Sequence, residues 1–165
     1  MSGRVLVAGV GNIFLGDDGF GSAVAQQLGG EPLAAGVKVA DFGIRGVHLA
    51  YELLDGYDAL VLVDAVSRGD PPGTLSVIDA SGAAPGDGGG DGVLAAMDAH
   101  GMDPGAVLAM VGDLGGEVAQ VLVVACEAAS VAEGIGLSEP VTAAVPAAVQ
   151  AVKELIGTLV EEGSS

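Results

Sequence analysis

The chain has 165 residues, of which 50% are hydrophobic and 3% aromatic, so it is long enough for one domain with a core of Ala, Val, Leu and Ile. Its 22 acidic and 5 basic residues give a net charge of -17, which would repel a phosphate backbone and argues against nucleic-acid binding. A single cysteine, Cys126, excludes an intrachain disulfide and a cysteine-based zinc site.

The N-terminal sequence lacks the charged region, apolar stretch and cleavage site of a signal peptide. No window approaches the ~18 uninterrupted apolar residues of a membrane-spanning helix. We therefore expect a soluble cytoplasmic protein that does not bind a membrane.

Apolar β-branched runs alternate with helical spacing along the chain. In chain order, the pattern predicts a strand at 4–10, a helix at 18–30, a strand at 37–43, a helix at 47–56, strands at 59–66 and 74–80, a helix at 103–115, a strand at 119–128 and a long helix at 140–162. Pro-Pro-Gly at 71–73 marks a turn before a strand that we expect at a sheet edge. A glycine-rich patch occupies 82–92.

This order predicts an α/β fold with three α/β/α layers, of the phosphorylase/hydrolase-like kind. Its mostly parallel, twisted sheet would have about five strands, with helices on both faces. In such sheets, binding sites form beyond the carboxyl ends of the strands. Polar residues at the predicted strand ends are therefore the candidates for a functional site.

The first strand leads into a glycine-rich loop, VGNIFLGDDGFG, at residues 10–21. A dinucleotide-binding turn needs a third glycine, but Phe14 stands at that position. No Gly-Lys-Ser/Thr follows, and Asp17 and Asp18 would repel a pyrophosphate. A nucleotide-binding domain is therefore a poor interpretation of this loop.

Acidic or imidazole side chains lie at three places at or near strand ends. Asp17 and Asp18 stand at the start of a predicted helix, where acids also serve as caps. Asp64 follows an apolar strand, and His100 precedes a predicted helix. Two carboxylates and an imidazole that converged on one crevice would suit a divalent cation such as zinc or nickel.

The remaining residues with reactive side chains receive no functional role. We assign no role to His48, which lies in a predicted helix beside Arg45 and Tyr51. Cys126 falls in a buried strand and is interpreted as a small core residue. Without a G-x-S-x-G turn, an acyl-enzyme mechanism has little support.

In combination, the motifs resemble those of the hydrogenase maturation endopeptidases, which trim the C-terminal extension of [NiFe] hydrogenase large subunits. The motifs that carry this resemblance are GxGNxxxxDDGxG after the first strand, a strand ending in VDAV, a later His before a helix, and GIGLSEPV at 134–141. The resemblance runs from about Arg4 to Val160 and implies one hydrogenase maturation protease domain over residues 1–165.

Matched residue by residue, the resemblance implies that Asp18, Asp64 and His100 are the catalytic and metal-contacting residues. It places Gly11 and Asn12 in the same opening motif. Residues 41–46, DFGIRG, occupy the place of a loop thought to shape the substrate cleft, which makes Asp41, Gly43 and Gly46 candidate cleft residues.

The resemblance further implies an endopeptidase that acts after nickel insertion and recognises nickel already bound in the large-subunit precursor. Another divalent cation could replace it in vitro. The alternative is a non-catalytic precursor-binding protein, either a chaperone or a pseudo-protease, but three intact ligand positions favour the enzyme. We expect a monomer.

Overall fold

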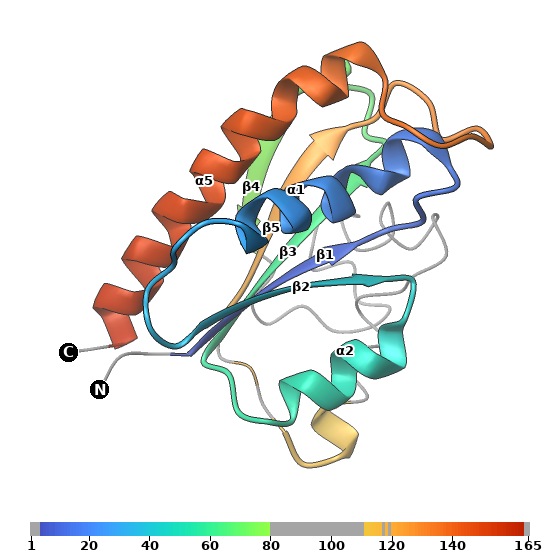
Figure 1. Cartoon of the computed structure of the whole chain (residues 1–165). Coiled ribbons are helices and arrows are strands. Elements are labelled where there is room, and N and C mark those ends of the chain that lie inside the picture. Colours follow the sequence, from blue (N-terminus) through green and yellow to red (C-terminus); the bar gives the residue numbers. More distant parts are fainter. Residues whose placement is uncertain (1–3, 80–110, 117, 119, 164–165) are drawn as a thin grey trace.

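The computed structural model describes residues 4–79, 111–116, 118 and 120–163. In this part of the chain, five strands form one sheet in the order β2-β1-β3-β5-β4. Figure 1 shows α1 and α5 on one face of the sheet and α2 on the other. The predicted α/β fold, with three layers and a mostly parallel sheet, is confirmed.

The parallel strands are β1 (Val5–Val10), β2 (Val37–Gly43), β3 (Ala59–Val66) and β5 (Gln120–Glu127). All residues of β1 and β3 are buried, as expected for central strands covered on both faces. The short strand β4 (Leu75–Asp79) pairs with β5 in the antiparallel direction, at the predicted edge. The strands thus agree closely with the sequence-based prediction.

The helices depart from prediction mainly at their ends. The region predicted as one helix at 18–30 begins with a 3-10 turn, η1 (Gly16–Gly19), followed by α1 (Phe20–Gly29). Helix α2 spans Gly46–Leu53, and α5 spans Glu139–Gly163 with Pro146 in its interior. Of the helix predicted at 103–115, only residues 111–115 are described, and residues 111–113 are helical.

Two apolar clusters fill the spaces between the layers. One packs α2 against the sheet, with Leu49 and Leu53 buried beside Phe42. The other packs α1 and α5 against the opposite face, and Val152 and Ile156 belong to its buried residues. Aliphatic side chains make up most of both clusters, as the composition predicts.

Among the described helices, α5 alone is long and apolar enough to cross a membrane by length and composition. Its residues Val141, Ala148 and Val152 are fully buried against the protein itself. The helix therefore serves as a layer of the core, which accounts for its apolar stripe.

Candidate functional site

The site lies where β1 and β3 approach their carboxyl ends. The two strands are parallel neighbours, and Gly9 is level with Val63. Asp64 therefore lies beside the end of β1, two residues before β3 ends at Val66. This register brings a side chain of β3 toward the loop that leaves β1.

The loop after β1 delivers Asp18 to the same place. Asp18 belongs to the 3-10 turn, and its side chain is fully buried. One carboxylate oxygen accepts a hydrogen bond of 2.7 Å from the backbone N–H of Asn12. The loop thus folds back on itself and fixes the Asp18 carboxylate.

Asp18 and Asp64 lie close together, because a Cβ atom on Gly11 would meet both residues. Burial, then the negative charge of Asp18 and an interaction with its side chain, holds the pKa of Asp64 well above its usual value. The Ala65 N–H, 2.8 Å from Asp64 Oδ1, opposes this shift only in part. Asp64 thus retains a proton at pH values where an exposed aspartate has lost its own.

Gly11 makes this close approach possible. Its φ of +125° is rarely adopted by residues with a side chain. A Cβ atom on Gly11 would lie 2.1 Å from the Asp18 carbonyl oxygen and 2.9 Å from Asp64 Oδ1. The glycine-rich loop therefore makes room for two acids, where a nucleotide-binding loop would make room for a phosphate.

The other predicted cleft residues lie next to this pair. The Gly11 N–H donates a hydrogen bond of 2.9 Å to the Gly43 carbonyl, which joins the ends of β1 and β2. The Asp41 carboxylate accepts hydrogen bonds from the Ser22 hydroxyl and the Gly43 N–H. Gly46 begins α2 just beyond. The structure therefore brings these residues together, and their contact with a substrate stays a prediction.

The side chain of Asn12 has a local use. Its Oδ1 accepts a hydrogen bond of 2.9 Å from the Phe14 N–H, two residues along the chain. This turn shapes the loop, a role that aspartate and asparagine commonly have. A role of Asn12 in the substrate cleft stays a prediction.

Asp17, which the sequence analysis left without a role, anchors a distant loop. Its carboxylate accepts hydrogen bonds from the backbone N–H groups of Ala129, Ser130 and Ser138, and from the Ser138 hydroxyl. Burial by itself would raise the pKa of Asp17, but these four hydrogen bonds outweigh it and the pKa lies below its usual value. Adjacent acids thus have separate roles.

Backbone hydrogen bonds also join the loop after β1 to the loop that contains Gly134. Gly16 donates to Gly134, and Gly134 donates to Phe14, each at 2.8 Å. Figure 1 shows the two segments side by side at the same end of the sheet. The GIGLSEPV motif is therefore packed against the opening loop. Asp17 and Ser138 are both polar residues within conspicuous motifs, but their distance of 121 positions in the sequence gives no sign that they are hydrogen-bonded.

A cation could use the carboxylate pair, because two buried acids at strand ends provide hard oxygen ligands close together. Within the described residues, no three His, Cys, Asp or Glu side chains form a metal-binding group. The predicted third ligand, His100, lies outside the described residues. The metal assignment of Asp18, Asp64 and His100 therefore stays a prediction, with the first two brought together as expected.

The chain matches a family model described as HycI, hydrogenase maturation protease, over residues 23–155. This match includes Asp64 and begins after Asp18. Among curated proteins, the hydrogenase expression/formation protein HupD of Rhodobacter capsulatus is 40% identical over 73 residues, or 44% of this chain and 34% of that protein. HupD of Rhizobium leguminosarum is 36% identical over 77 residues, or 46% and 38% of the two chains. The match thus spans less than half the length of these curated relatives.

Solved structures resemble the whole chain. A hydrogenase 2 maturation peptidase from Thaumarchaeota archaeon SCGC_AB-539-E09 is 33% identical, with a TM-score of 0.69 over 93% of this chain and 98% of that one. The maturating endopeptidase HybD of E. coli has a TM-score of 0.75 over 94% and 93%, and at 24% identity it supports the fold alone. The chain belongs to the hydrogenase maturation protease family.

Proposed function

We propose that this protein is an endopeptidase that removes the C-terminal extension of a [NiFe] hydrogenase large-subunit precursor after nickel has been inserted. The observation that carries the proposal is the buried pair of Asp18 and Asp64, which lie together at the carboxyl end of the sheet. Membership of the hydrogenase maturation protease family supports the reaction class.

The chemistry required is addition of water to a peptide carbonyl, cleavage of the C–N bond and protonation of the departing amine. A carboxylate can take a proton from the attacking water, and a neighbouring carboxylic acid can donate one to the amine. Burial and the charge of Asp18 raise the pKa of Asp64, which suits Asp64 to the role of the acid.

The precursor's nickel would be recognised as part of the substrate, through Asp18, Asp64 and His100. Such an ion would supply positive charge that polarises the scissile carbonyl. Its binding requires both carboxylates to be ionised, so the ion would displace the proton that Asp64 holds. Another divalent cation would bind the same oxygens in vitro.

Exposed apolar side chains near the site support a protein substrate. Ile13 and Phe14 lie in the opening loop, and Ile135 lies in the loop anchored by Asp17; their exposed fractions are 44%, 60% and 78%. Apolar side chains gathered at one end of a protein often mark a contact surface for a partner. We further propose that the protein acts as a cytoplasmic monomer.

The test is trimming of a nickel-loaded precursor by the wild type and by Asp18→Asn, Asp64→Asn and His100→Ala. We expect each variant to lose activity by about 100-fold or more, because each removes a group that acts on the substrate. Asp113→Asn is the matched control, because Asp113 is exposed on a short helical segment outside the site. It should trim at the wild-type rate.

Two outcomes would contradict the proposal. Full activity in Asp18→Asn and Asp64→Asn would remove the carboxylate pair from the mechanism. Equal trimming of nickel-free and nickel-loaded precursors would show that nickel is not recognised. Binding of the precursor without any trimming by the wild type would instead favour a non-catalytic precursor-binding protein.

A further inference from the structure

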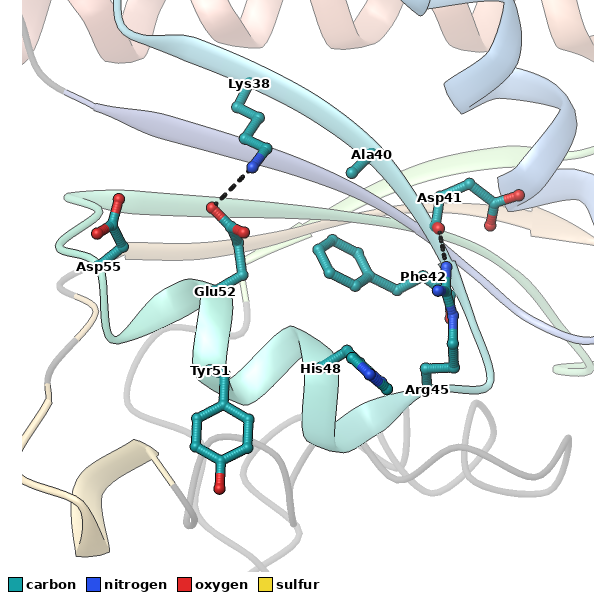
Figure 2. Close-up of a pocket in the computed structure, with 9 residues that line it drawn as sticks. All are labelled: Lys38, Ala40, Asp41, Phe42, Arg45, His48, Tyr51, Glu52 and Asp55. Atoms are coloured by element: carbon teal, nitrogen blue, oxygen red, sulfur yellow. Dashed lines mark hydrogen bonds and ion pairs between the residues drawn. The ribbon is translucent and has the colours of Figure 1, made fainter.

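A hollow of about 630 Å³ lies between β2 and α2, on the face of the sheet opposite α1 and α5 (Figure 2). Ala40 and Phe42 supply its apolar surface. Lys38 and Glu52 lie toward one end, and Arg45 lies at the other. The hollow thus combines an apolar surface with separated charged groups.

Its cations are unusual for so acidic a chain. The whole sequence has 5 basic residues against 22 acidic ones, and Lys38 and Arg45 both line this hollow. His48, one of two histidines in the sequence, lines it as well. The hollow therefore concentrates positive or hydrogen-bond-donating groups where the rest of the chain supplies few.

Two of the acids that line the hollow are paired with groups of the protein itself. Glu52 accepts a hydrogen bond of 2.6 Å from Tyr57 and forms an ion pair of 3.1 Å with Lys38. Asp55 forms an ion pair of 3.2 Å with Arg4. Lys38 and Arg4 therefore largely compensate the charges of Glu52 and Asp55.

The third acid, Asp41, faces away from the hollow. Figure 2 shows its carboxylate directed away from the Arg45 guanidinium, while its backbone carbonyl faces Arg45. The carboxylate instead accepts hydrogen bonds from Ser22 and Gly43. Asp41 therefore contributes backbone, and little negative charge, to this end of the hollow.

Arg45 is held in place by neutral groups. Its Nε donates to the Phe42 carbonyl at 3.1 Å, and one terminal nitrogen donates to the Asp41 carbonyl at 2.7 Å. No carboxylate of the described residues forms an ion pair with it. Backbone carbonyls thus orient the guanidinium in advance, in a geometry suited to binding a carboxylate.

The hollow adjoins the carboxylate pair through the end of β2. The Gly43 carbonyl accepts the Gly11 N–H at 2.9 Å, and Gly11 contacts Asp18 and Asp64. Residues 41–45 therefore connect the two regions directly. An extended peptide positioned at the carboxylate pair can continue along these residues into the hollow.

We propose that this hollow binds a carboxylate of the peptide that is removed from the precursor, with Arg45 as the cation and His48 as a further hydrogen-bond donor. The proposal rests on the proposed function for the identity of the peptide. The carboxylate belongs either to an acidic side chain or to the chain terminus of the extension. Ala40 and Phe42 contact the neighbouring aliphatic part of the peptide.

Binding is tested by titrating the full-length ¹⁵N-labelled protein with three short peptides and following its backbone amide signals. The first is acetyl-Ala-Leu-Glu amide, the second is acetyl-Ala-Leu-Gln amide, and the third is acetyl-Ala-Leu-Ala with a free carboxyl terminus. We expect carboxylate-bearing peptides to shift the signals of Phe42, Arg45 and His48, with dissociation constants on the order of millimolar. The glutamine peptide should leave them unchanged.

The first and third peptides distinguish the two sources of the carboxylate. A response to the glutamate peptide alone assigns the hollow to an acidic side chain, and a response to the free terminus alone assigns it to the chain end. A response to both shows that a carboxylate from either source suffices. No response at these residues, or an equal response to the glutamine peptide, would overturn the proposal.

Substitutions test the cation itself. Arg45→Met should weaken peptide binding about tenfold, because a charged hydrogen-bond donor is lost, and Arg45→Lys should restore part of it. His48→Gln should weaken binding about twofold. Lys153→Met removes the same charge from α5, on the opposite face, and should bind as the wild type does. Wild-type affinity in folded Arg45→Met and His48→Gln proteins would overturn the proposal.

Trimming kinetics separate this proposal from the proposed function. Arg45→Met should raise KM for the precursor about tenfold with kcat unchanged, since Arg45 lies away from the reacting carboxylates. If wild type trims the precursor and Arg45→Met does so with an unchanged KM, the hollow is not a substrate site. If the wild type trims nothing but binds the acidic peptides through Arg45, the proposed function fails and the carboxylate site stands.

Discussion

Asp17 and Ser138, 121 residues apart in the sequence, are joined by two hydrogen bonds. The Ser138 N–H donates to Asp17 Oδ1 at 2.6 Å, and the Ser138 hydroxyl donates to Oδ2 at 2.8 Å. With Ala129 and Ser130 bound to the same carboxylate, this pair fastens the 129–138 loop to the loop that carries Asp18.

Replacing Asp17 should destabilise the protein. Asp17→Ala leaves three partly buried N–H groups without their acceptor, so we expect the free energy of unfolding to fall by about 3 kcal/mol. Ser138→Ala removes one hydroxyl donor and should cost about 1 kcal/mol. Urea unfolding measures both changes, and equal stability of Asp17→Ala and wild type would contradict the anchoring role.

The same carboxylate should make stability depend on acid pH. The pKa of Asp17 is lower in the folded protein than in the unfolded chain, so its contribution is complete above the unfolded pKa of 3.8 and is lost as pH falls through the folded pKa. Below about pH 4, wild type should therefore approach the stability of Asp17→Asn. Urea unfolding at a series of pH values checks this, and a gap that stays constant down to the lowest pH would contradict it.

Asp64 should contribute a pH dependence of stability opposite in sign to that of Asp17. Its pKa is raised on folding, so stability is complete below the unfolded pKa of 3.8 and declines as pH rises toward the folded pKa. Asp64→Asn cannot ionise and should be more stable than wild type at neutral pH by about 1 kcal/mol, although we expect it to be inactive. The difference in stability between Asp64→Asn and wild type should vanish near pH 3. Asp113→Asn, at an exposed position, should show no such gain.

A side chain at Gly11 should disrupt the carboxylate pair. Gly11→Ala requires an unfavourable φ and places Cβ against Asp18 and Asp64, so we expect a loss of about 3 kcal/mol in stability and about 100-fold in trimming rate. Gly157→Ala is the matched control. Gly157 lies within α5 with nothing within 4 Å of its added Cβ, and the change should stabilise the helix by about 0.5–1 kcal/mol.

Tyr57 should lose its hydroxyl proton at a higher pH than an exposed tyrosine does. Burial, the hydrogen bond to Glu52 and the charge of Glu52 raise the pKa of Tyr57 to about 12. Its stabilising contribution is therefore complete below the unfolded pKa of 10.0 and is lost as pH rises toward 12. The chain has two tyrosines and no tryptophan, so tyrosinate absorbance is easily followed. Tyr57→Phe should remove the ionisation step near pH 12; absence of any tyrosinate step near pH 12 in wild type would contradict the shift.

The strands were readable from sequence because central parallel strands are continuous aliphatic runs. Residues 37–43 and 59–66 were predicted with the bounds that the structure shows. Asp64 was found because it follows an apolar strand run, at the sheet edge where α/β folds form their sites. The 3-10 turn before α1 was missed, because Gly-Asp-Asp-Gly satisfies the start of an α-helix equally well.

The site was predictable only where residue type limited the chemistry. The convergence of Asp18 and Asp64 followed from the rule that carboxyl ends of parallel strands share an edge. The partners of Asp17 and the orientation of Arg45 depend on non-local hydrogen bonds to backbone groups, which leave no pattern in residue types. His100 stays a prediction.

The 3-10 turn of four residues has a structural consequence. Because it has about three residues per turn, its two adjacent aspartates point in different directions. One is clamped to the loop that displays Ile135, and the other meets Asp64. A single peptide unit therefore separates the carboxylate that holds the exposed 129–138 loop from the carboxylate that lies beside Asp64.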